Sequence, residues 1–181
     1  MTMTMLRRPG FAAKSPLATL ALAAGLLAAA GAHAEDVVRH VPQGATLPIA
    51  QAVEVPADKT TVYVSGMVPP VIDDKADKST QAAYGDTKTQ TVGVLKNIDK
   101  ALKGLNLTMG NVVKMQAYLV GDPAKGGRMD FAGFMEGYKE FFGTAEQPNL
   151  PSRSVMQVAG LVSPGWLVEI EVTAVRPSPK S

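Results

Sequence analysis

Two stretches near the carboxyl end of the chain, Arg153–Leu161 (RSVMQVAGL) and Leu167–Val175 (LVEIEVTAV), decide the fold class. Successive side chains point to opposite faces of a β-strand. In the second stretch Val, Ile, Val and Ala occupy the even positions from 168 to 174, whereas Glu169 and Glu171 take the other face. This alternation predicts two strands, each buried on one face, with a turn at Ser163–Gly165 between them.

The preceding chain carries further strand and helix patterns. Apolar residues recur every three or four positions between 94 and 105, as in a helix with one buried face. The predicted elements are strands Ala50–Val55 and Thr61–Val68, helix Thr80–Leu105, strand Val112–Val120, helix Met129–Phe142, and strands Arg153–Leu161 and Leu167–Val175. The order β-β-α-β-α-β-β predicts an α+β two-layer sandwich in which two helices cover a mixed sheet. The apolar pair Val37–Val38 is expected to pair at a sheet edge.

The amino-terminal segment has the pattern of a secretory signal. Residues 1–34 contain Arg7, Arg8 and Lys14 but no acid, followed by the apolar run Leu17–Ala30 and the sequence Ala-His-Ala at 32–34. A basic start, a short apolar run and small residues at the end are typical of a cleaved export signal. An uncleaved anchor is the alternative, but a run shorter than about 20 residues favours cleavage. We therefore expect one domain, Glu35–Ser181, in the periplasm or secreted, free of the membrane.

Composition removes several classes of function. The chain has no cysteine and two histidines, of which His33 belongs to the predicted signal, so a His- or Cys-built metal site and a cysteine nucleophile are excluded. Loss of the signal changes the net charge from +2 to −1, which gives no electrostatic basis for binding nucleic acid. No metal site is expected.

The two final strands also carry the best candidates for chemistry. Alternation places Arg153 and Val155 on one face of their strand, and we expect Arg153, Glu169 and Glu171 to lie in adjacent strands. One interpretation is an exposed cross-strand salt bridge without function. The other is a pocket in which Arg153 binds a carboxylate through two parallel hydrogen bonds while a glutamate holds water.

Several segments resemble the RidA/YjgF family, also called the endoribonuclease L-PSP or enamine/imine deaminase family. Leu150–Ser154 (LPSRS) followed by Val168–Val175 (VEIEVTAV) is similar to that family's P-A-R-S and I-E-I-E-A-I-A-V. Val62–Pro69 resembles its I-x-x-S-G-Q-I-P strand, and Val113–Val120 its V-K-x-T-V-F-V strand. The helix from Gln90 to Leu105 and the Tyr138–Phe142 segment (YKEFF) resemble two further family motifs, in the same order along the chain.

The resemblance implies a fold, an assembly and an activity. The family fold is chorismate-mutase-like with the same order of elements, and its members are homotrimers with a cleft between each pair of subunits. The deaminase branch hydrolyses 2-imino or enamine acids to 2-keto acids and ammonia without a cofactor. By the same resemblance Arg153 would bind the substrate carboxylate, assisted by the backbone N–H of Val155. Glu169 would hold the catalytic water, and Gly66 would lie against the ligand.

This chain also differs from the deaminase branch. It has Val155 in place of a cysteine, Ile49 in place of a tyrosine, Met135 in place of an asparagine and Met67 in place of a glutamine. The resemblance implies a small carboxylate or imino acid as the partner, and these differences leave two functions open: an imine deaminase, or a non-catalytic protein that binds small carboxylates. The nuclease function in the family's older name is disfavoured, because the mature chain is near neutral and its one histidine, His40, lies in the leader, the segment Glu35–Pro48 that precedes the first predicted strand.

Overall fold

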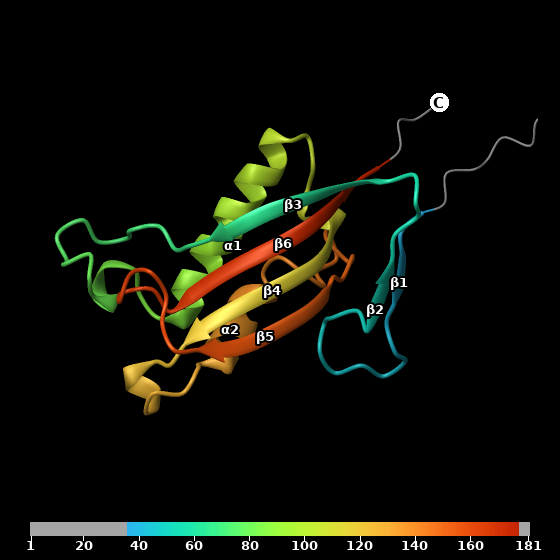
Figure 1. The fold of residues 1–181 in the computed structure, drawn as a ribbon. Helices are drawn as coiled ribbons and strands as arrows, with labels where there is room; N and C mark the ends of the chain where they lie inside the picture. Colours follow the sequence, from blue (N-terminus) through green and yellow to red (C-terminus); the bar gives the residue numbers. More distant parts are fainter. Residues whose placement is uncertain (1–35, 178–181) are drawn as a thin grey trace, which may run out of the picture. The chain divides into compact units, whose positions relative to one another are not determined.

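The computed structural model describes residues 36–177, which form a four-stranded sheet, two helices and a short two-stranded ribbon (Figure 1). The predicted signal, residues 1–34, lies outside this range. The helices and strands are β1 (Val38–His40), β2 (Ala52–Glu54), β3 (Thr60–Met67), α1 (Thr87–Gly104), β4 (Val112–Val120), α2 (Phe131–Tyr138), β5 (Ser152–Val158) and β6 (Val168–Arg176), with short 3-10 turns between them. The predicted α+β order is confirmed.

The sheet is mixed and has the strand order β3-β6-β4-β5. β6 is antiparallel to both of its neighbours, whereas β4 and β5 are parallel, with α2 in the connection between them. β4 therefore lies between β5 and β6, and the expectation that Arg153 and the two glutamates occupy adjacent strands is wrong. Alternation within a strand does not determine which strand is its neighbour.

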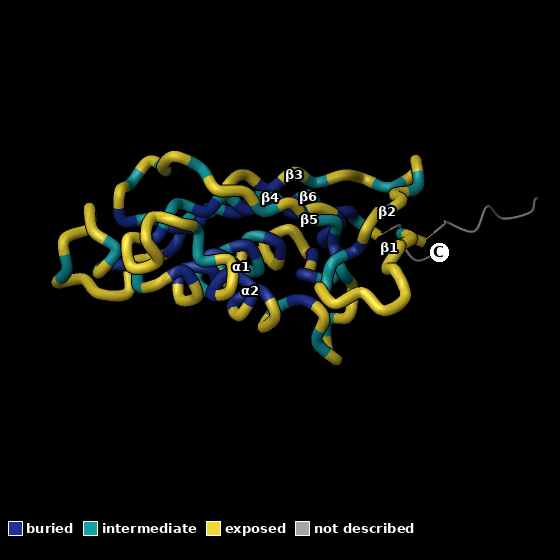
Figure 2. The backbone as a smooth tube through the Cα atoms, turned by 90° about the horizontal axis from the view of Figure 1, so that it is seen from below, coloured by how far each residue is buried: buried dark blue, intermediate teal, exposed yellow. Residues whose placement is uncertain are grey.

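Both helices cover one face of the sheet and leave the other face open (Figure 2). Asp86 caps α1 by accepting a hydrogen bond from the Thr89 N–H (2.8 Å), and Asp130 caps α2 through the Gly133 N–H (3.0 Å). The layer between helices and sheet is closely packed. Its largest fully buried side chains include Phe134, Tyr138, Phe142, Leu95, Ile98, Leu102, Met115, Leu119 and Ile170.

Helix α2 is shorter than the pattern predicted. It ends at Tyr138, and the N–H groups of Phe141 and Phe142 both bond to the Tyr138 carbonyl in a turn. Gly143 follows with φ +75°, a left-handed conformation that suits glycine and ends the helical path. The aromatic residues keep a helical spacing through this turn, which explains why the sequence suggested a longer helix.

Strand β1 of the leader pairs with β2, which lies within the predicted strand Ala50–Val55, and this separate ribbon is not part of the four-stranded sheet. Arg39 attaches this ribbon to the sandwich by donating hydrogen bonds to the carbonyls of Gly110 (3.0 Å), Val112 (2.9 Å) and Leu150 (2.6 Å). Ala50 forms a single bridge to Ser152 at the start of β5. The leader is thereby held beside the strand that carries Arg153.

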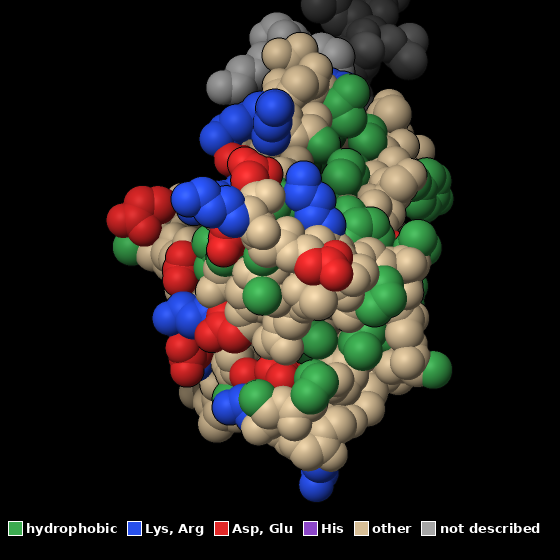
Figure 3. Space-filling model, turned by 90° about the vertical axis from the view of Figure 1, so that its left-hand side faces the viewer, with side chains coloured by type: hydrophobic (Ala, Val, Ile, Leu, Met, Phe, Trp, Pro, Cys, Tyr) green, Lys and Arg blue, Asp and Glu red, His purple; other side chains and the backbone are tan. Residues whose placement is uncertain are grey.

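Figure 3 shows acidic and basic side chains interspersed over one face, without a surface of a single sign. Within residues 36–177, no helix is long and apolar enough to cross a membrane.

Candidate functional site

Arg153 lies on the helix-covered face of the edge strand β5, beneath α2. Its Cζ atom is 4.2 Å from the ring centroid of Tyr138 and 5.1 Å from that of Phe134. Its Nη2 donates to the Met135 Sδ at 3.1 Å, and sulfur is a weak acceptor. Aromatic faces attract a guanidinium, so these rings hold the cation in place without neutralising it.

The guanidinium of Arg153 lacks the partners that a buried cation needs. Its Nε and Nη1 are shielded from solvent and have no hydrogen-bond partner among residues 36–177, and no ion pair of that range includes it. Burial lowers its pKa, and the neighbouring Tyr138 opposes this shift. An arginine stays charged at physiological pH. Because unpaired buried donors destabilise a protein, this arrangement suits an anion that supplies the missing acceptors.

Tyr138 connects this cation to the leader. Its hydroxyl donates to the Pro48 carbonyl (2.9 Å), and the Ala50 N–H bonds to the Pro151 carbonyl (3.0 Å). Burial raises the pKa of Tyr138 to about 12, although Arg153 acts against this rise. The tyrosine is therefore neutral at physiological pH, and its hydroxyl can donate to the Pro48 carbonyl. Because Pro48 and Ala50 are both bonded to the sandwich, the residue between them, Ile49, lies beside the site.

Glu169 lies on the open face of β6, against Gly66. A Cβ atom at position 66 would overlap the Glu169 carboxyl group, so only glycine leaves room for it. The register of β3 shifts between Val64 and Met67, which produces a bulge at this point. At the start of β6, the buried Gln90 amide accepts from the Leu167 N–H (2.7 Å) and donates to the Gly165 carbonyl (3.1 Å). These contacts fix the strand end from which Glu169 projects.

A polar cluster next to Glu169 was not identified from the sequence. Tyr118 lies opposite Glu169 in the strand register and donates to the Glu171 Oε1 (3.2 Å), and Gln116 donates to both Glu171 and the Tyr118 hydroxyl. The pKa of Tyr118 is raised, first by desolvation and then by its bond to Glu171. The cluster adjoins a cavity of about 320 Å³ lined by Tyr63, Val64, Ser65, Lys114, Gln116, Glu171, Val172 and Thr173. The available signal was the alternation of polar residues at positions 114, 116 and 118 of this strand.

The structure thus divides the predicted site residues between the two faces of one sheet. Arg153 and Val155 pair in register with the buried Met115 and Ala117, on the side of the helices. Glu169 lies on the open side in β6, two strands away from β5, and Gly66 lies beside it in β3, three strands away. The interpretation as an exposed cross-strand salt bridge is therefore wrong, because Arg153 faces α2 instead of a glutamate.

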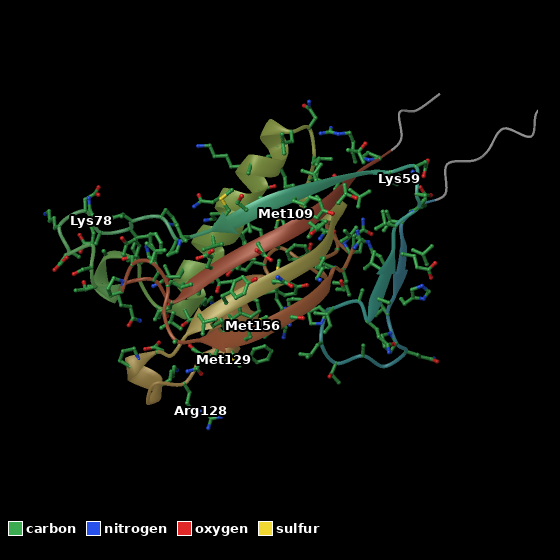
Figure 4. All side chains as sticks on the ribbon, in the orientation of Figure 1. Lys59, Lys78, Met109, Arg128, Met129 and Met156 are labelled. Atoms are coloured by element: carbon green, nitrogen blue, oxygen red, sulfur yellow. The ribbon has the colours of Figure 1, made fainter. Side chains whose placement is uncertain are left out.

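Figure 4 shows Met129 and Met156 at the end of β5 that is remote from the ribbon. The backbone N–H of Met129 donates to the Gln157 Oε1 (2.9 Å), so the segment that leads into α2 is attached to this end of the strand. Within residues 36–177, no group of three or more His, Asp and Glu side chains is placed to hold a metal ion.

The profile of the family described as endoribonuclease L-PSP matches residues 43–176, which is most of the chain. The chain belongs to the RidA/YjgF (endoribonuclease L-PSP) family. As a RidA/YjgF member it is 34% identical over 116 residues to the 2-iminobutanoate/2-iminopropanoate deaminase of Rattus norvegicus, covering 64% of this chain and 73% of the rat protein. It is 32% identical over 129 residues to a RutC family protein of Leuconostoc mesenteroides subsp. cremoris, covering 71% and 88%.

Solved structures have the same fold. E. coli TdcF with bound serine aligns at a TM-score of 0.51 and 29% identity, covering 77% of this chain and 99% of TdcF. The Rid family protein YyfB of Yersinia pestis aligns at a TM-score of 0.56 and 23% identity, covering 75% and 96%. At that identity the second alignment supports the fold alone.

Proposed function

We propose that this protein hydrolyses reactive 2-imino or enamine acids to 2-keto acids and ammonia. The observation that carries the proposal is Arg153, a half-buried cation with two shielded, unpaired donors and no carboxylate partner in the described part of the chain. A substrate carboxylate satisfies such a cation, and it displaces the Met135 thioether from Nη2, since a carboxylate is much the stronger acceptor. The 34% identity to the rat deaminase supports the same chemistry.

The site we propose needs two copies of the chain. Arg153 and Glu169 lie on opposite faces of one sheet and are separated by β4, so a small substrate does not reach both within a protomer. A homotrimer in which the β5 edge of one copy meets the open face of the next copy brings the two groups together three times. Such a cyclic arrangement uses the same contact at every interface.

The reaction depends more on the positions of the substrate and the attacking water than on strongly reactive side chains. Arg153 and the backbone at Val155 fix the substrate carboxylate, and Glu169 of the second copy orients a water molecule toward the imine carbon. The water oxygen bonds to that carbon as the C=N π pair moves to the nitrogen and Glu169 accepts a proton from the water, which gives a carbinolamine. Glu169 returns this proton to the nitrogen. The hydroxyl then gives up its proton to Glu169, the C=O bond forms as the C–N bond breaks, and ammonia leaves with the remaining proton as ammonium. An iminium carbon is already electrophilic, so a correctly held water is the main requirement.

A trapping assay tests this function. An amino-acid oxidase generates imines in the presence of semicarbazide, and the purified protein is expected to compete with the trap by releasing the 2-keto acid. Arg153→Ala is expected to abolish this competition. A folded wild-type protein that accelerates the hydrolysis of no imine contradicts the proposal.

A second function is a small-carboxylate-binding protein that does not turn its ligand over. The observation in its favour is that Met135, an apolar residue, contacts the guanidinium directly. Calorimetry with 2-keto acids is then expected to show binding that depends on Arg153, without hydrolysis of the matching imines. Absence of any Arg153-dependent binding contradicts this alternative.

We further propose that residues 1–34 direct export and are removed, which places the domain 35–181 in the periplasm or outside the cell. Sequencing the amino terminus of the exported protein is expected to begin at Glu35. An intact amino terminus on a membrane-bound protein supports the uncleaved anchor instead.

A further inference from the structure

Apolar side chains continue from Arg153 toward the amino end of α2. Met135 contacts the guanidinium, and Phe131 lies one turn earlier on the same side of the helix. Phe131 is 37% exposed, and its ring stacks on Phe134, with 6.3 Å between the centroids. The Phe134 ring in turn contacts the cation. A row of apolar groups therefore runs from the charged site to the surface.

Strand β5 lies along the same row. Met129, just before α2, bonds to Gln157, whereas Met135 contacts Arg153, so helix and strand run in opposite directions. Val155 follows Arg153 on the same face at about 6.6 Å, the rise of two strand residues. One turn of α2 is about 5.4 Å. Phe131 and Val155 consequently lie at similar distances beyond the guanidinium.

We infer that Phe131, Met135 and Val155 receive the side chain of the ligand and select 2-imino and 2-keto acids with large apolar, above all aromatic, side chains. The inference rests on the proposed function for the carboxylate position at Arg153. With the carboxylate there, a side chain that points along α2 reaches Phe131 after about one helical turn, roughly the length of a benzyl group.

The chemistry of the three residues sets the preference. A ring, a thioether and two methyl groups have no strong hydrogen-bonding group, so a polar ligand side chain loses water without gaining a partner. An aromatic ligand instead buries its area and stacks on the Phe131 ring in the offset or edge arrangement that aromatic pairs adopt. The polarisable Met135 sulfur adapts to aliphatic and aromatic shapes alike.

Calorimetry on the full-length protein tests the inference without requiring turnover. We measure Kd for pyruvate, hydroxypyruvate and phenylpyruvate, which differ only in the side chain. Phenylpyruvate is expected to bind at least about tenfold more tightly than pyruvate, which corresponds to about 1.4 kcal/mol. Hydroxypyruvate is expected to bind no more tightly than pyruvate. Equal affinities for phenylpyruvate and pyruvate overturn the inference.

Variants locate the effect. Phe131→Ala is expected to reduce the ratio of the pyruvate and phenylpyruvate Kd values by about fivefold or more, and Phe131→Leu, which keeps the apolar bulk, by less. The matched control is Leu105→Ala, which removes an apolar side chain of similar exposure (43%) at the end of α1 and is expected to leave the ratio unchanged. A ratio that survives Phe131→Ala overturns the inference, whether or not imines are hydrolysed. If the wild-type protein hydrolyses no imine but still binds phenylpyruvate more tightly than pyruvate, the proposed function is overturned and the inference is not.

Discussion

Mixing two inactive variants, Arg153→Ala and Glu169→Ala, is expected to restore activity. Each variant alone lacks one of the two groups at every site. In a mixed assembly, a site is complete wherever the Arg153 face comes from a Glu169→Ala chain and the Glu169 face comes from an Arg153→Ala chain. The prediction follows from the placement of the two residues on opposite faces of one sheet.

The expected recovery follows from the same geometry. With equal amounts of both chains assorting at random, each face has a probability of about one half of carrying the intact residue. About one quarter of all sites are then complete before selection. Purification through both tags removes the assemblies of a single variant, and a mixed homotrimer has one complete site out of three, so kcat per site in the purified protein is expected to reach about one third of wild type. The two chains are co-expressed with different affinity tags, purified through both tags, and assayed for release of the 2-keto acid.

The control replaces the Glu169→Ala chain with the double variant Arg153→Ala/Glu169→Ala, which has no intact face to contribute and is expected to give no recovery. The reasoning is refuted if the doubly tagged assembly is folded and as inactive as the single variants. Both residues would then act within one protomer.

Three further predictions concern stability. Gly66→Ala places a methyl group against the Glu169 carboxyl and is expected to lower the free energy of unfolding in urea by about 1–3 kcal/mol and to lower activity. Gly104→Ala, with open space around it, is expected to raise that free energy by a few tenths to about 1 kcal/mol. A Gly66→Ala variant that is more stable than Gly104→Ala contradicts the geometry. The pKa of Tyr138 is raised from 10.0 to about 12 in the folded state, so its contribution to the free energy of unfolding is complete below pH 10 and is lost as the pH rises to 12. Tyr138→Phe is expected to flatten this alkaline decline of stability in thermal unfolding. A decline that is unchanged in the variant contradicts the assignment to Tyr138. Arg39→Lys keeps the charge but not the planar fork that binds three carbonyls, and a loss of about 1–3 kcal/mol is expected; a thermal midpoint equal to wild type would show that the leader contributes nothing to stability.

The sequence predicted the order of the elements because each carries its own local signal. The alternation in Leu167–Val175 assigned the glutamates and the apolar residues to opposite faces, as the structure has them. The same alternation is silent on long-range pairing, which is why β6 between β3 and β4 was not anticipated. The attachment of the ribbon to the sandwich was not predicted for a related reason, since Arg39 bonds to backbone carbonyls, which leave no mark in the sequence.

The candidate site was only partly accessible to the same reasoning. The pairing of Arg153 and Val155 on one face follows from spacing, but which face α2 covers is a property of the packed fold. The stacking of Arg153 on Tyr138 and Phe134 depends on how α2 packs against β5, and the pattern of residues within β5 does not contain this information. The Gln116–Tyr118–Glu171 cluster depends on the register of β4 against β6, which no residue pattern specifies.

The bulge in β3 has a consequence for solubility. β3 is an edge strand of the four-stranded sheet, and a regular edge offers a row of unpaired backbone groups to strands of other chains. The irregular register between Val64 and Met67 interrupts that row in the last part of the strand. Bulges of this kind twist an edge away from further pairing. The distortion that accommodates the Glu169 carboxyl beside Gly66 therefore also protects the folded chain from aggregation through its edge, so one local departure from ideal strand geometry serves two needs.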